Sequence, residues 1–223
     1  MKKKILVTRK LLIENEEKLK ELFDVKLNSK DELYTSDKII ELSKDCDGIL
    51  SAITDQFNKD LIEKLSSSIK IIANFAVGFG NIDVNAAAKK NIVVTNTPEV
   101  LDDSTADISI LLLLGASRKV LEARRAAELQ NWKWSADFML GKQMSNKRLG
   151  ILGMGRIGRA VAKRARGFNM EIHYHNRSQL SKDLEEGAIY HKTVKDLFNC
   201  SDFLSINCPA TKETNKIINK ETI

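Results

Sequence analysis

Short apolar runs alternate with amphipathic segments along residues 4–95. The runs predict strands over residues 4–8, 25–27, 48–52, 69–75 and 92–95, and the amphipathic segments predict helices over residues 11–23, 37–44, 58–66 and 84–90. This alternation is typical of a parallel sheet with helices on both faces. We therefore expect an α/β fold whose first part is a small doubly wound, flavodoxin-like domain.

Two of these helices carry more detailed signals. In the first, Leu12, Leu19, Leu22 and Phe23 form the face that we expect to be buried. In the second, Ser36 is the predicted N-cap, because its hydroxyl can accept a hydrogen bond from an N–H group of the first turn.

A longer helix is predicted over residues 102–129, with candidate N-caps at Asp102, Asp103, Ser104 and Thr105. It is apolar nearly all round over residues 108–116 and then becomes basic. Because an apolar surface is rarely left facing water, we expect this first half to be buried, either between two domains or against another subunit.

An apolar run over residues 149–152 enters the turn Gly153-Met154-Gly155-Arg156-Ile157-Gly158, which leads into a predicted helix over residues 159–168. The spacing G-x-G-x-x-G between a strand and a helix indicates a dinucleotide site. Gly153 would allow the tight turn, Gly155 the approach of the pyrophosphate and Gly158 close packing of helix on strand, with the phosphates on free N–H groups. The alternative is a glycine-rich turn without a ligand.

The next predicted strand, residues 170–175, ends at Asn176-Arg177-Ser178. An acidic residue usually stands near this strand end and binds the adenosine ribose. Here no carboxylate would repel a 2′-phosphate, the Arg177 guanidinium can pair with one, and Asn176 and Ser178 can donate hydrogen bonds. The segment favours NADPH over NADH. The alternative is that Arg177 is a surface cation and that either cofactor serves.

A second glycine-containing turn, residues 76–83, follows the strand predicted over residues 69–75. Ligands bind at the carboxyl ends of parallel strands, and free N–H groups beside Gly78 and Gly80 could hold a carboxylate. The alternative is that these glycines only shape the turn.

Charge and composition exclude several classes of function. The 36 basic and 30 acidic residues give a net charge of +6 and are interspersed along nearly the whole chain, which is typical of a solvated surface rather than of nucleic-acid binding. The longest apolar run, residues 108–116, is too short to cross a bilayer, and the apolar run at residues 5–7 is far shorter than that of a signal peptide, so we expect none. Cys46, Cys200 and Cys208 form no CxxC pair and indicate reduced thiols. We expect a cytoplasmic protein without nucleic-acid or membrane partners.

The chain has three histidines, and two of them, His173 and His175, share one face of a predicted strand. No Glu, Asp or Cys joins them at ligand spacing, so we expect no metal site. These two and His191 also belong to the adenosine side of the predicted dinucleotide fold, remote from the nicotinamide. A hydride transfer to a carbonyl needs a proton donor, so we expect the general acid to be absent from this chain.

These features together resemble the D-isomer-specific 2-hydroxyacid dehydrogenases, most closely their glyoxylate and hydroxypyruvate reductase branch. The matching segments are residues 76–83, 96–101, 105–107, 149–158, 165–168, 174–178, 201–203 and 207–209, with Thr211 and Thr214. They follow the order of the family and cover essentially the whole chain.

The resemblance implies a substrate domain over residues 1–98 and a Rossmann-type NAD(P)-binding domain over residues 99–223 that is incomplete at its C-terminus. It also implies that Val77 and Gly78 bind the substrate carboxylate. The residues that it implies around the cofactor are Leu101 and Thr105 at the nicotinamide, Gly153, Met154, Gly155, Arg156, Ile157 and Gly158 at the pyrophosphate, Asn176, Arg177 and Ser178 at the adenosine ribose or its phosphate, and Cys208 and Pro209 in a neighbouring turn.

In the family the catalytic arginine, glutamate and histidine lie beyond the position of Ile223, so we expect no catalytic residue in this chain, which looks truncated. The resemblance implies reduction of a small 2-oxo acid such as glyoxylate or hydroxypyruvate with NADPH or NADH, and a homodimer when the chain is full length. We expect no turnover by this polypeptide alone. The alternatives are a cofactor-binding, non-catalytic fragment, a redox-sensing partner, or a flavin or other nucleotide site that would leave Val77 and Gly78 unexplained.

Overall fold

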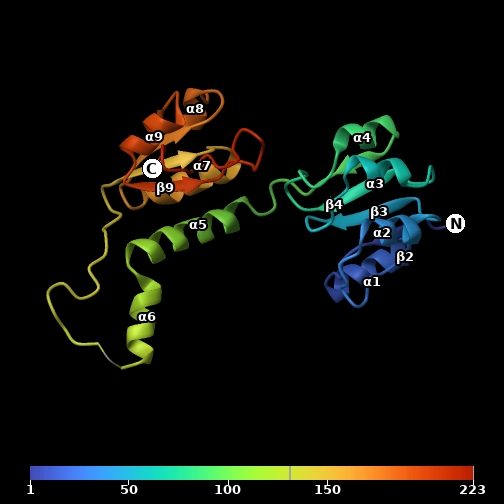
Figure 1. The fold of residues 1–223 in the computed structure, drawn as a ribbon, viewed down its shortest axis with the longest axis horizontal. Helices are drawn as coiled ribbons and strands as arrows, with labels where there is room; N and C mark the ends of the chain where they lie inside the picture. The colour runs from blue at the N-terminus through green and yellow to red at the C-terminus, as the bar shows by residue number, and fades with distance from the viewer. Residues whose placement is uncertain (131, 223) are drawn as a thin grey trace. The chain divides into compact units, whose positions relative to one another are not determined.

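The computed structural model describes residues 1–130 and 132–222, and the chain divides into two compact units, Met1–Val100 and Leu101–Ile223 (Figure 1). Within the described residues, none of the helices has both the length and the apolar character that a bilayer crossing requires.

The first unit is built on a five-stranded sheet in which every neighbouring pair of strands is parallel. Its strands are β1 (Lys4–Val7), β2 (Asp24–Lys26), β3 (Gly48–Ala52), β4 (Ile71–Phe75) and β5 (Val93–Thr95), in the order β2-β1-β3-β4-β5. This is the strand order of flavodoxin-like doubly wound sheets, which confirms the predicted fold class for this unit.

The helices of the first unit are α1 (Ile13–Leu22), α2 (Ser36–Ser43), α3 (Lys59–Lys64) and α4 (Val84–Lys89). Right-handed crossovers place α1 on one face of the sheet and α2, α3 and α4 on the other, and Figure 1 shows α3 and α4 together across the sheet from α1. The face with three helices holds the core, in which Leu6, Ile49 and Ile72 of the strands meet Phe57 and Ile62.

Two details of the sequence prediction are wrong in this unit. Leu12 and Leu22, predicted to be buried, are exposed, because α1 lies alone on its face beside the edge strand β2. The N-cap of α2 is Thr35 rather than Ser36: its hydroxyl accepts a hydrogen bond of 3.3 Å from the N–H group of Lys38. The two residues are adjacent, and Thr35 has the extended backbone of an N-cap, whereas Ser36 is already the first residue of the helix.

The second unit is built on a four-stranded parallel sheet, in the order β8-β7-β6-β9. Its elements are α5 (Asp102–Ser117), α6 (Val120–Glu128), β6 (Arg148–Leu152), α7 (Arg156–Arg166), β7 (Glu171–His175), α8 (Lys182–Glu185), β8 (Ile189–Tyr190), α9 (Val194–Cys200) and β9 (Phe203–Ile206). The order corresponds to the first four strands of the Rossmann fold, with its topological switch point between β6 and β9.

The long helix predicted over residues 102–129 is broken in the structure. Lys119 has a φ of 53°, a left-handed conformation that ends α5 and precedes α6. The predicted N-caps are also wrong, since α5 begins after Leu101 without a side-chain cap. The apolar segment is buried on one side only: Ala106 is buried near α7, whereas Leu111 and Leu112 are 61% and 65% exposed.

Candidate functional site

The glycine-rich turn joins the carboxyl end of β6 to the start of α7, and two of its glycines are required by the backbone. Gly153 has a φ of 91°, and a Cβ there would lie 2.5 Å from the backbone nitrogen of Cys208. A Cβ on Gly158 would lie 2.5 Å from the carbonyl oxygen of Gly153. These contacts match the tight turn and the close helix packing predicted from the sequence.

Gly155 differs from its two neighbours, because a Cβ built on it meets no atom within 4 Å. Gly155 is the N-cap of α7, and the N–H groups of Gly155, Ile157 and Gly158 have no acceptor within the described residues. A helix N-terminus with free N–H groups and a positive dipole end attracts anions. The turn therefore carries hydrogen-bond donors without acceptors in the described residues, and Gly155 faces open space.

The end of β7 holds this turn in place. The Oδ1 atom of Asn176 accepts a hydrogen bond of 2.7 Å from the N–H group of Met154, and the N–H group of Gly153 donates to the carbonyl of His175 at 3.0 Å. The sequence predicts that Asn176 contacts the ribose or its phosphate, and in the structure its Oδ1 atom positions the turn. Arg177 and Ser178 beside it are exposed, and the charge of Arg177 helps to lower the pKa of Glu213.

A buried polar network supports the segment that carries Arg177. The Tyr174 hydroxyl donates to Glu185 Oε1 at 2.7 Å and accepts from the N–H group of Leu180 at 2.9 Å, while Gln179 donates to the same carboxylate oxygen at 2.8 Å. Burial and the Glu185 carboxylate raise the pKa of Tyr174 to about 12. This network is not predictable from the sequence, since no motif connects Tyr174 with Glu185.

The remaining predicted cofactor residues of the second unit lie on two sides of the turn. Leu101 and Thr105 are at the start of α5, which an ion pair of 3.4 Å between Arg156 and Asp102 joins to the glycine-rich turn. Cys208 follows β9, whose end is held to β6 by a hydrogen bond of 2.8 Å from the N–H group of Asn207 to the carbonyl of Leu152. Pro209 comes next and is exposed.

In the first unit, Val77 and Gly78 lie in the turn that follows β4. Their carbonyl groups are held by side-chain amides: Asn96 donates to the Val77 carbonyl at 2.8 Å and the buried Asn74 donates to the Gly78 carbonyl at 2.9 Å. Their N–H groups have no acceptor in the described part of the chain. The turn is thus anchored through its carbonyl groups and keeps its donors available.

A pocket of about 290 Å³ lies beside this turn. It is lined by Phe79, Val84, Ala88, Ile92, Val94, Thr95 and Asn96. Asn96 both lines the pocket and holds the Val77 carbonyl, so the apolar pocket and the donor-bearing turn are neighbours.

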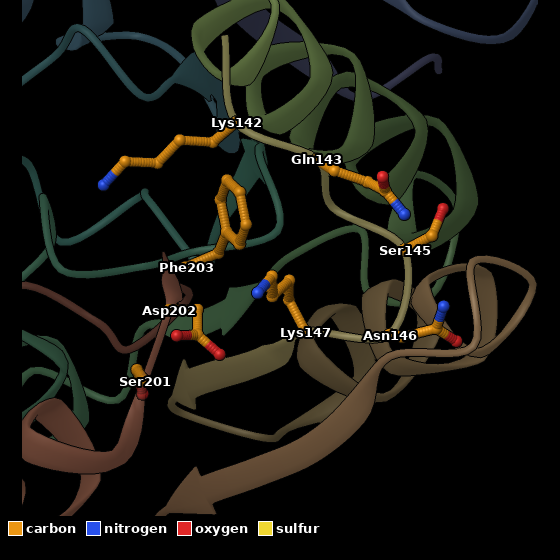
Figure 2. A pocket seen from close by; sticks show the side chains of 8 residues that line it. All are labelled: Lys142, Gln143, Ser145, Asn146, Lys147, Ser201, Asp202 and Phe203. Atoms are coloured by element: carbon orange, nitrogen blue, oxygen red, sulfur yellow. The ribbon is translucent and has the colours of Figure 1, made fainter.

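A second pocket, of about 770 Å³, lies elsewhere (Figure 2). Lys147 and Asp202, two of its lining residues, directly precede β6 and β9, so this pocket lies at the amino ends of these parallel strands. Ligands of open α/β sheets bind at the carboxyl ends. The pocket in Figure 2 is therefore at the opposite edge of the sheet from the glycine-rich turn.

Residues 110–223 match the family model described as "D-isomer specific 2-hydroxyacid dehydrogenase, NAD binding domain". Among curated relatives, a glyoxylate reductase from Korarchaeum cryptofilum is 41% identical over 226 residues, and a glycerate dehydrogenase from Hyphomicrobium methylovorum is 36% identical over 225 residues. Both alignments cover 100% of this chain, and they cover 68% and 70% of the two relatives.

Solved structures agree with these sequence relatives. A glyoxylate reductase from Paecilomyes thermophila is 33% identical with a TM-score of 0.87, over 99% of this chain and 69% of its own. An NADPH-dependent glyoxylate/hydroxypyruvate reductase from Sinorhizobium meliloti, in complex with NADP and malonate, is 31% identical with a TM-score of 0.84, over 98% of this chain and 66% of its own. The chain therefore belongs to the family of D-isomer-specific 2-hydroxyacid dehydrogenases.

Proposed function

We propose that this chain carries the NADPH-binding and carboxylate-binding parts of a reductase that acts on a small 2-oxo acid such as glyoxylate or hydroxypyruvate. The observation that carries the proposal is the open glycine-rich turn, with free N–H groups at Gly155, Ile157 and Gly158 and the exposed Arg177 near the end of the adjacent strand. The Sinorhizobium relative is NADPH-dependent and was solved with NADP and malonate, which supports both a phosphorylated dinucleotide and a carboxylate as ligand classes.

In this proposal the cofactor lies over the carboxyl ends of β6 and β7. The three free N–H groups of the turn bind the pyrophosphate, since they are donors at a helix N-terminus. Arg177 and Ser178 bind the 2′-phosphate, because a guanidinium pairs with phosphate through two hydrogen bonds. Leu101 and Thr105 line the nicotinamide side. When bound, the cofactor supplies the hydride.

The N–H groups of Val77 and Gly78 bind the substrate carboxylate. They have no acceptor in the described residues, and their carbonyl groups are already fixed by Asn96 and Asn74. A turn held in this way loses little conformational freedom when an anion binds. The orientation of the substrate then depends on backbone donors rather than on a mobile side chain.

The proton for the 2-oxo group requires a donor within hydrogen-bond reach of that oxygen. The three histidines of the chain are all close to β7: His173 and His191 contact each other, and His175 contacts the carbonyl group of His191. We propose that the 223-residue polypeptide on its own binds cofactor without turning over, and that catalytic residues outside it complete the reaction.

Titration of the 223-residue chain with NADPH and NADH, followed by a cofactor-oxidation assay with glyoxylate and hydroxypyruvate, tests this function. A phosphate–arginine pair is worth about 1.5–3 kcal/mol, so NADPH is expected to bind roughly 10- to 100-fold more tightly than NADH. No oxidation above the buffer rate is expected. Tighter binding of NADH would contradict the cofactor assignment, and clear turnover would contradict the assignment of the proton donor.

We further propose that the second unit forms a homodimer through α5 and α6. Both helices carry apolar side chains that are exposed among the described residues: Ile108, Leu111 and Leu112 of α5, and Val120 and Leu121 of α6. An apolar patch of adjacent exposed side chains is typical of a protein interface. A two-fold interface uses the same patch on both subunits, so this single patch is sufficient to form a homodimer.

A further inference from the structure

Three potential metal ligands converge in the second unit, at a point that the proposed reductase chemistry does not use. His173 lies on β7, His191 follows β8, and Cys200 is the last residue of α9. The His173 Nδ1 atom is 2.8 Å from His191 Nε2, and the Cys200 Sγ atom is 3.5 Å and 3.4 Å from these two nitrogens. All three ligand atoms lie within 4.8 Å of one another.

The sequence pairs His173 with His175 on one strand face, and no metal site is predicted there because no Glu, Asp or Cys joins them at ligand spacing. The structure places a different histidine beside His173. Since β7 and β8 are parallel and His173 is paired with Ile189, His191 lies two residues beyond that pair and on the same face of the sheet as His173. The helix α9 then returns to the sheet and adds Cys200, which completes a set that sequence spacing alone did not indicate.

We propose that His173, His191 and Cys200 bind a zinc ion. Zn–N bonds of about 2.0–2.1 Å and a Zn–S bond of about 2.3 Å in tetrahedral geometry separate nitrogen from sulfur by about 3.5 Å and nitrogen from nitrogen by about 3.3 Å. Both sulfur–nitrogen distances already have this value. The two imidazole nitrogens need to separate by about half an ångström from their present 2.8 Å to admit the ion.

A carboxylate behind the cluster orients one of the ligands. Glu171 Oε1 lies 2.7 Å from the Nε2 atom of His173, whose side chain is 8% exposed. An N–H group directed at this carboxylate leaves the Nδ1 lone pair of His173 toward the cluster, which is the arrangement of carboxylate, histidine and zinc found in metal sites.

The donor set is also chemically suited to zinc, which binds imidazole nitrogen and thiolate sulfur. Binding at neutral pH converts the Cys200 thiol to a thiolate and releases its proton to the buffer. Three protein ligands leave the fourth coordination position to water. The ion would tie α9 to the β7–β8 edge of the sheet.

Titration of the full chain with Co²⁺, which reports on zinc sites by its absorption spectrum, tests the proposal. We expect one Co²⁺ per chain, a thiolate-to-cobalt charge-transfer band in the near ultraviolet, tetrahedral d–d bands in the visible, and loss of these bands when Zn²⁺ is added. Cys200→Ser should remove the charge-transfer band. Cys208→Ser, which changes a thiol outside the cluster, should keep it.

A second variant separates loss of the site from loss of folding. Glu171→Gln keeps all three ligands and should weaken zinc affinity about 10- to 100-fold, as expected for a residue that orients a metal-bound histidine. Zn²⁺ should raise the melting temperature of the wild-type chain and of Cys208→Ser but not that of Cys200→Ser. Absence of the bands in wild-type chain with native circular dichroism would overturn the proposal, as would a charge-transfer band that persists in Cys200→Ser.

Discussion

The Oδ1 atom of Asn176 accepts a hydrogen bond of 2.7 Å from the N–H group of Met154, which ties the end of β7 to the glycine-rich turn. Loss of this bond in Asn176→Ala should cost about 1 kcal/mol in the ordering of the turn and weaken binding of both NADPH and NADH roughly fivefold. Fluorescence titration of the two cofactors measures the change. A loss confined to NADPH would indicate instead that Asn176 contacts the 2′-phosphate.

Arg177 is predicted to act on NADPH alone. Its side chain is exposed, so Arg177→Ala removes a partner of the 2′-phosphate without disturbing the fold. Affinity for NADPH should fall roughly 10- to 100-fold while affinity for NADH stays within about twofold. Arg125→Ala, at another exposed arginine, serves as the matched control and should change neither value. Equal losses for both cofactors would contradict the assignment.

Gly153 and Gly155 of the turn should respond differently to alanine. Gly153→Ala places a Cβ 2.5 Å from the Cys208 nitrogen at a positive φ, and a destabilisation of about 3 kcal/mol is expected. The methyl group of Gly155→Ala would lie in open space, so the free energy of unfolding of this variant should fall by about 1 kcal/mol or less. Its cofactor binding should be lost, because the methyl group occupies the proposed pyrophosphate position. Urea unfolding and cofactor titration of each variant distinguish the two effects. Gly155→Ala with unchanged cofactor binding would count against a pyrophosphate at this turn.

Acid stability should depend on the pair formed by Asp202 and Arg148. Hydrogen bonds from the Arg148 guanidinium at 3.1 Å and from its backbone N–H at 2.9 Å lower the pKa of Asp202 from 3.8 to about 2. A carboxyl with a lowered folded-state pKa stabilises the fold above its unfolded value and loses this contribution as the pH falls toward 2. Asp202→Asn should therefore be less stable than wild type near neutral pH, and the gap should close in acid. Thermal unfolding across this pH range measures the difference in stability between wild type and Asp202→Asn. A difference that stays constant with pH would show that the Asp202–Arg148 pair is not its source.

The proposed homodimer predicts a specific effect of charge on α5. Leu112 is 65% exposed in the chain, and Leu112→Glu would place a carboxylate in the interface, where an unpaired charge is costly to bury. Sedimentation velocity should show twice the monomer mass for the wild-type chain and the monomer mass for the variant. Leu33→Glu, at an exposed leucine of the first unit, is the matched control and should leave the dimer intact.

Local spacing in the sequence was enough to predict the class of fold and the dinucleotide turn. The alternation of apolar runs and amphipathic segments led to parallel sheets because each strand must be followed by a covering helix. The roles of Gly153 and Gly158 followed from their spacing, and in the structure a Cβ at either position would lie 2.5 Å from a backbone atom. Exact helix ends were less predictable. The N-cap of α2 is Thr35 and not the predicted Ser36, and Lys119 interrupts a helix that the apolar pattern predicted to be continuous.

Contacts between residues far apart in the sequence were decided only by the tertiary structure. The bond from Met154 to Asn176, the Tyr174–Glu185 network and the cluster of His173, His191 and Cys200 all depend on which strands are neighbours and on how their registers align. Periodicity determines which side chains share a face of one element, but it contains no information about which face of another element lies opposite. The sequence by itself therefore determined the dinucleotide fingerprint and the family. The positioning of Arg177 depended on the packing of β7 against α8, and the proposed zinc site on the packing of β7, β8 and α9.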